Sequence, residues 1–138
     1  MPFDHSSRFL RIVLTIDAIT CAAVGVLQLA VPGLLARWLG LGTALLLDTG
    51  WFLIAYAALL LMLSRSRAIR PGLLIAVIAA NLAWGLGCLL FAFDLDLPVT
   101  TLGKAYLCTQ ALSVFALAIL QWHGRRTSTG AGLAVKST

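Results

Sequence analysis

One acidic residue, Asp17, stands alone inside a long apolar stretch of this chain. A carboxyl group in such surroundings can bind a proton or a cation, or it can accept hydrogen bonds from polar neighbours. Placing it in hydrocarbon costs about 2.5–3.5 kcal/mol on insertion scales, so it has to face other polar groups and not lipid. The identity of those neighbours decides which of these roles Asp17 plays.

Polar residues deep in the other apolar stretches are the predicted neighbours of Asp17. At about 1.5 Å of rise per helical residue, the depths of Tyr56, Asn81 and Ser113 agree with that of Asp17 to within about 4 Å. Trp84 lies about one turn from Asn81, and Gln110 lies about one turn from Ser113, each on the same helix face. The predicted site, described as ligand-binding, contains Asp17, Tyr56, Asn81, Trp84, Gln110 and Ser113.

Two interpretations of this site stay open at the level of sequence. In the first, it is a buried hydrogen-bond network that fixes which helices meet and in what register. In the second, it is a small polar cavity that binds a ligand, an ion or protons. Trp84 lies too deep for an interfacial aromatic belt, so it belongs either to the packed core or to the wall of the cavity.

The residues required by many membrane enzymes and cofactor sites are missing from the apolar stretches. Both histidines, His5 and His123, lie outside them, which argues against an intramembrane haem or histidine-bound metal. The cysteines Cys21, Cys88 and Cys108 form no C-x-x-C pair and are expected to pack as small apolar residues. A single buried acid also lacks a partner for general acid–base catalysis. We therefore expect no catalytic residue, no cofactor and no metal.

Four apolar stretches have to position these polar groups, and they fill most of the 138 residues. They cover residues 9–30, 44–63, 72–93 and 102–122, and each is long enough to cross a bilayer as a helix of about 20 residues. Hydrophobic residues make up 61% of the chain and charged residues only 11%. The sequence therefore predicts an all-α transmembrane antiparallel four-helix bundle over residues 1–123, followed by a disordered cytoplasmic tail at 124–138.

The basic residues predict the orientation in the membrane. Arg37 and Lys104 fall on one side, next to the acidic loop that carries Asp94 and Asp96. The other eight of the ten Lys and Arg residues share the opposite side: Arg8, Arg11, Arg65, Arg67, Arg70, Arg125, Arg126 and Lys136. Because cytoplasmic loops carry the excess of positive charge, both termini are expected in the cytoplasm. This distribution also accounts for the net charge of +5 without a nucleic-acid partner.

Short loops predict that successive helices are antiparallel neighbours. Small residues along 76–87 are suited to close approach against those along 18–25, so the first and third helices are expected to pack closely. Asp48 and Lys104 lie near the outer ends of the second and fourth stretches, where they are expected to form an interfacial ion pair. An exposed pair of this kind contributes only about 0–1 kcal/mol.

The loops carry signals for where the helices begin and end. Pro32 ends the first stretch and is followed by a short amphipathic segment that places Trp38 at the outer interface. Pro71 suits the first turn of the third helix. Thr100 or Thr101 is a suitable N-cap for the fourth helix.

Several short motifs give the chain a family resemblance. They are Arg11 and Asp17, the run Trp38 to Leu41, Tyr56, Asn81 with Trp84, Thr101 with Gly103, and Gln110. With these motifs the chain resembles a set of small uncharacterised bacterial four-span membrane proteins over residues 8–123, and it is similar to the DoxX-like group in architecture only. The resemblance implies a multi-pass protein of the bacterial inner (plasma) membrane, and it implies no chemistry.

Taken together, these patterns favour a small, non-enzymatic membrane protein. We expect an accessory or assembly subunit that acts through helix–helix contacts in the lipid bilayer, with a second copy or another membrane protein as partner. The alternative is a binding or transport module for a small amphiphile or ion, which uses the polar pocket around Asp17. A membrane enzyme is the third and least favoured reading.

Overall fold

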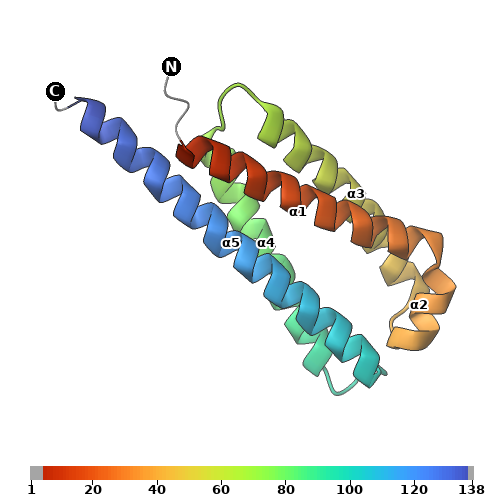
Figure 1. Ribbon diagram of the computed structural model, residues 1–138. Coiled ribbons are helices and arrows are strands. Elements are labelled where there is room, and N and C mark those ends of the chain that lie inside the picture. The colour runs from red at the N-terminus through yellow and green to blue at the C-terminus, as the bar shows by residue number, and fades with distance from the viewer. Residues whose placement is uncertain (1–4, 137–138) are drawn as a thin grey trace.

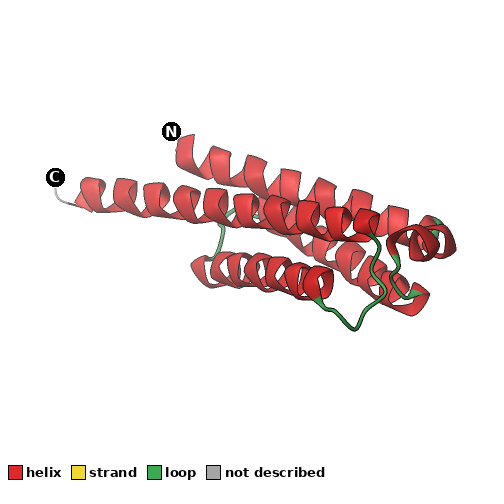
Figure 2. Cartoon of the chain, turned by 90° about the horizontal axis from the view of Figure 1, so that it is seen from below, coloured by secondary structure: helices red, strands yellow, loops and turns green. Residues whose placement is uncertain are grey.

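The structure is a computed structural model that describes residues 5–136, with side chains described for residues 7–127. In this part of the chain all regular structure is helical, and no strand is present (Figure 2). The helices are α1 (His5–Ala30), α2 (Pro32–Leu39), α3 (Thr43–Arg65), α4 (Pro71–Phe93) and α5 (Thr101–Lys136).

Four of these helices are long and apolar enough to cross a membrane, as the sequence predicts. The candidate spans are Ser7–Ala30, Thr43–Arg65, Pro71–Phe93 and Thr101–Thr127. The predicted disordered tail differs from the structure, because α5 continues to Lys136. The chain has no proline after Pro98, so nothing in the sequence forces the backbone hydrogen bonds of α5 to stop near Trp122.

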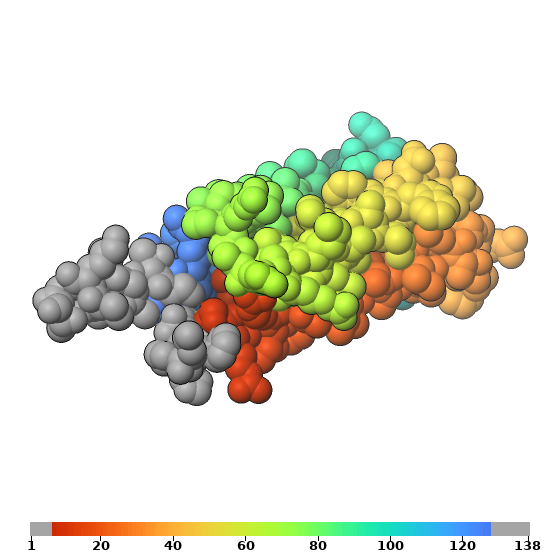
Figure 3. Space-filling model, turned by 90° about the horizontal axis from the view of Figure 1, so that it is seen from above, coloured from red at the N-terminus to blue at the C-terminus, as the bar shows by residue number. Residues whose placement is uncertain are grey.

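The long helices pack as two pairs. α1 lies along α3, α4 lies along α5, and the two pairs meet where α1 contacts α5 (Figure 1). Figure 3 shows α1 and α3 side by side on one face of the molecule. Among the described residues, no Cα atom of α4 comes within 8 Å of a Cα atom in α1 or α3. The predicted close contact between the first and third spans is therefore wrong. The small residues of α4 therefore do not bring its backbone against α1. Glycines at other helix contacts make the close backbone approaches instead.

Glycines set the distance between the helices of each pair. A Cβ atom at Gly25 of α1 would lie 3.0 Å from the carbonyl oxygen of Gly50 in α3, so the two backbones almost touch there. In the other pair, a Cβ atom at Gly85 of α4 would lie 2.6 Å from the ring of Phe115 in α5. In lipid, where no hydrophobic drive joins helices, such close packing is what holds them together.

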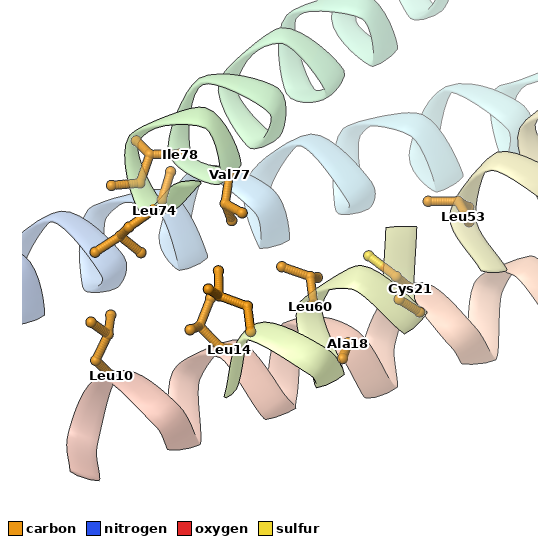
Figure 4. Close-up of a cluster of buried hydrophobic side chains, with 12 residues drawn as sticks. Leu10, Leu14, Ala18, Cys21, Leu53, Leu60, Leu74, Val77 and Ile78 are labelled. Atoms are coloured by element: carbon orange, nitrogen blue, oxygen red, sulfur yellow. The ribbon is translucent and has the colours of Figure 1, made fainter. Parts of the chain in front are cut away.

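Apolar side chains fill the space between the pairs. One buried cluster joins Leu10 and Leu14 of α1 to Leu60 of α3 and to Leu74 and Val77 of α4 (Figure 4). The side chains of α4 thus reach the α1–α3 pair although the backbones stay apart. A second buried cluster occupies the half of the molecule near α2: Leu35, Leu39, Leu41, Leu46, Cys88, Ala92, Leu107 and Ala111.

The end of the molecule that contains α2 is held by main-chain contacts. The Thr100 hydroxyl accepts a hydrogen bond from the Gly103 N–H at 3.0 Å, which confirms Thr100 as the N-cap of α5. The same hydroxyl donates to the carbonyl of Trp38 at 2.6 Å, and the Thr100 N–H donates to the carbonyl of Leu39 at 3.0 Å. Gly40 ends α2 with φ of 70°, a left-handed conformation that favours glycine.

An arginine holds the opposite end. The Arg11 guanidinium of α1 donates to the main-chain carbonyls of Ser64 and Ser66, each at 2.7 Å, and to that of Arg67 at 3.2 Å. The last carbonyls of a helix have no partner within the helix, so Arg11 satisfies groups at the end of α3. Pro71 then starts α4 in its first turn, as predicted.

Candidate functional site

Asp17 is fully buried and receives hydrogen bonds from two amide side chains. Its Oδ2 atom accepts from Nδ2 of Asn81 at 2.8 Å and from Nε2 of Gln121 at 2.7 Å. The two amides also contact each other, since Asn81 Nδ2 lies 3.2 Å from Oε1 of Gln121. One turn along α1, the Cys21 thiol donates to Oδ1 of Asp17 at 3.6 Å.

Tyr56 completes this group from the remaining long helix. Its hydroxyl lies 3.3 Å from both the Asn81 Oδ1 atom and the main-chain carbonyl of Val77. Each long helix therefore supplies at least one member of what we call the Asp17 cluster: Asp17, Cys21, Tyr56, Asn81 and Gln121. Asn81 occupies its centre, because it contacts three of the other members.

The helix arrangement explains why these particular side chains meet. The α4 backbone stays away from α1 and α3, so α4 reaches the other pair only through side chains that extend inward, while α5 packs directly against α1. Asn81 and Gln121 extend inward from the α4–α5 pair, and both are almost fully buried. A carboxyl group surrounded by hydrogen-bond donors meets the requirement that a buried polar group be paired.

A second polar group, the Gln28 cluster, lies further along the same helices. The Gln28 side chain of α1 is 3% exposed, accepts from the Thr49 hydroxyl at 3.0 Å and donates to the Tyr106 hydroxyl at 3.0 Å. Gln110 lies one turn from Tyr106 along α5. The Trp84 indole N–H of α4 donates to Oε1 of Gln110 at 3.2 Å, so this cluster again involves all four long helices.

Aromatic rings connect the two clusters on the side where α3 faces α4. The Phe52 ring stacks on Tyr56 with centroids 6.0 Å apart and on Trp84 with centroids 5.6 Å apart. Phe52 is 53% exposed, so it forms part of the outer surface of the molecule. Aromatic side chains thus lie on the side of the molecule where the backbones of α3 and α4 stay apart.

The predicted site divides between these arrangements. Asp17, Tyr56 and Asn81 come together as expected, while Trp84 and Gln110 contact each other in the Gln28 cluster. The prediction that Ser113 lies beside Asp17 is wrong. Its hydroxyl bonds to the Thr109 carbonyl of its own helix at 2.9 Å and faces the exposed side of α5.

Sequence reasoning missed two members, Gln121 and Cys21, the second of which was expected to pack only as a small apolar residue. The predicted span ended at Trp122, which placed Gln121 at the membrane surface and Ser113 at the depth of Asp17. Because α5 continues well beyond Trp122, Gln121 is an internal residue of a longer helix. A glutamine eleven residues, or about three helical turns, from Gln110, with no proline after it, was the available signal.

The predicted ion pair between Asp48 and Lys104 is also absent. Both residues are exposed, and within the described part of the chain no ion pair joins them. The helices that carry them, α3 and α5, do not pack against each other, which explains why the two charges do not meet.

The Asp17 cluster is closed. Among the described side chains, every buried nitrogen and oxygen atom has a hydrogen-bond partner. Within the same residues, no group of three His, Cys, Asp or Glu side chains is placed to hold a metal ion. The cluster therefore satisfies its own polar groups and ties both helix pairs together.

In comparisons with known proteins, no family model, curated protein or solved structure matches this chain.

Proposed function

We propose that this chain is a non-enzymatic accessory or assembly subunit that acts through contacts of its transmembrane helices with another membrane chain. The closed Asp17 cluster supports this role, because a network with every polar atom paired serves to hold helices in register. A partner would therefore contact the outside of the four long helices, where the exposed side chains meet lipid.

The outer face of α4 is the observation that carries the proposal. Ala76, Ala79 and Ala83 are all exposed, although small residues at this spacing are what close helix packing requires. A Cβ atom added at Gly72 or Gly87 would meet nothing within 4 Å. The small-residue stripe that the sequence assigns to a contact with α1 is therefore left for another chain, either a second copy or a different membrane protein.

The topology that fits this role is an antiparallel four-helix bundle in the bacterial inner membrane, with both ends in the cytoplasm. Support comes from the contact of Arg11, near the start of α1, with the end of α3, and of Gln28, near the end of α1, with the start of α3. The basic residues at the Arg11 end favour its cytoplasmic placement, and the bacterial membrane rests on the sequence resemblance.

Cross-linking tests the proposed contact face. Single cysteines at Ala79 or Ala83, in a background with the native cysteines replaced by alanine, are expected to form a cross-linked species in native membranes. Cysteine at Ile19 of α1, which is 61% exposed on another face, serves as the matched control. Equal cross-linking from α4 and α1 would show that the α4 face has no special role.

A second candidate function is the binding of a small amphiphile, with Asp17 or Asn81 as the polar contact. The aromatic contacts between α3 and α4 favour it, because Phe52 is 53% exposed and stacks on Tyr56, which bonds to Asn81. An apolar chain entering there would displace Phe52, and its polar end would replace one hydrogen bond of the cluster.

Native mass spectrometry of the gently extracted protein distinguishes the two candidates. The accessory role predicts a complex that contains an additional protein chain. The second candidate predicts a small added mass that Asp17→Asn removes and Ser113→Ala retains, since the Ser113 hydroxyl contacts only its own helix. A monomer without any added mass would contradict both.

A further inference from the structure

A shallow pocket lies near the start of α1, away from both polar clusters. Its volume is about 240 Å³, and its lining residues are Arg8, Arg11, Ile12, Thr15 and Ile16. These positions are three, four, seven and eight residues apart from Arg8, so they share one face of the helix. The arginines lie toward the helix start, and the isoleucines lie deeper along the span.

The charge of Arg11 is not neutralised by its hydrogen bonds. Its three partners are main-chain carbonyls, which carry no net charge. The guanidinium is therefore held in place, keeps its positive charge and has N–H groups left for a further acceptor. A rigid guanidinium beside a second one is the donor arrangement that phosphate oxygens prefer.

Other positive charges gather at the same end of the molecule. By binding the loop after α3, Arg11 brings the exposed residues Arg65, Arg67 and Arg70 to this end. Among the described residues, the one carboxylate in the first half of α1 is Asp17, which faces the core and bonds to amides. The described charged groups around the pocket are thus positive.

The deeper half of the pocket is apolar. Ile12 and Ile16 are 51% and 50% exposed, so in a membrane they contact acyl chains. A ligand that matches both halves carries a phosphate at one end and a hydrocarbon chain at the other, aligned with the helix axis.

From this arrangement we infer that the pocket binds the phosphate-bearing headgroup of an anionic phospholipid. Arg8 and Arg11 hold the phosphate, and one acyl chain lies along Ile12 and Ile16. The inference requires that α1 cross a bilayer with its start at the membrane surface, and it does not depend on the accessory role.

Lipid binding in nanodiscs or by native mass spectrometry tests this site. The probes are phosphatidylglycerol and phosphatidylcholine, which differ in headgroup charge, and inorganic phosphate as competitor. The wild-type protein is expected to retain phosphatidylglycerol in preference to phosphatidylcholine. Arg8→Gln is expected to weaken that retention about fivefold, because it removes one of the two guanidinium groups that hold the phosphate.

Arg37→Gln in α2 is the matched control, because it removes the same charge from an exposed arginine at the other end of the molecule. It is expected to leave lipid retention unchanged. Equal losses from Arg8→Gln and Arg37→Gln would show a general charge effect and overturn the site. Displacement of the lipid by millimolar inorganic phosphate, without preference between the two lipids, would overturn the lipid assignment and leave a site for free phosphate.

Discussion

Asn81→Leu is expected to lower the free energy of unfolding by about 1–3 kcal/mol, the cost of leaving a buried polar group without its partner. The variant removes the 2.8 Å hydrogen bond to Asp17 and the contacts with Gln121 and Tyr56. The carboxyl group of Asp17 then keeps only Gln121 and the weak thiol donor. Unfolding of the protein in mixed detergent and SDS micelles, followed by circular dichroism, measures the change.

A matched pair of variants makes this result specific. Ser113→Ala is expected to change stability by less than about 0.5 kcal/mol, because its hydroxyl bonds only to its own helix. The triple variant Asp17→Leu, Asn81→Leu, Gln121→Leu is expected to be more stable than Asn81→Leu alone, since it leaves no carboxyl or amide group unpaired and only the weakly polar Cys21 thiol loses its partner. A triple variant that is less stable than the single one would contradict the explanation that Asn81→Leu is destabilising because of the polar groups it leaves unpaired.

The same variants separate stability from function. If the accessory role is correct, the triple variant keeps the cross-links formed from the outer face of α4, because that face does not depend on a charge in the core. Loss of the partner with full retention of the fold would instead place the function at Asp17.

The spans and the buried carboxyl were predictable from sequence for a simple reason. Length and apolar composition decide whether a helix can cross a bilayer, and both are local properties of the chain. A carboxyl group in such a helix has to face polar partners, so grouping Asp17 with Tyr56 and Asn81 needed only their depths. Depth along a helix follows directly from residue number.

The pairing of the helices was not predictable in the same way. Rotation about the helix axis and the choice of neighbour depend on contacts between residues that are distant in sequence. Gly25 and Gly50 illustrate this, because neither shows in isolation that it faces the other. The alanines of α4 form a more regular stripe and yet point outward. Gln121 was not predicted because the expected end of the fourth span, at Trp122, lies well before the end of α5. This shifted the expected depth of every residue in α5.

Gly103→Ala is expected to separate α2 from the start of α5. A Cβ atom at Gly103 would overlap the main-chain carbonyl of Leu39, and a backbone group cannot turn away as a flexible side chain can. The displaced α2 would lose the hydrogen bonds of Thr100 with Trp38 and Leu39, and the buried leucines Leu35 and Leu39 would leave their cluster.

The expected loss of stability for Gly103→Ala is about 1–3 kcal/mol, the usual cost of overpacking a filled interior, measured by the same SDS titration. Gly33→Ala is the control, because Gly33 is also helical and a Cβ atom there meets nothing within 4 Å. Alanine favours helix over glycine at both positions, so Gly33→Ala is expected to be neutral or slightly stabilising. Equal stability of the two variants would mean that α2 is not fixed on α5. The end of the molecule that contains α2 would then be held only by the apolar cluster and not by the main-chain contacts that Thr100 makes.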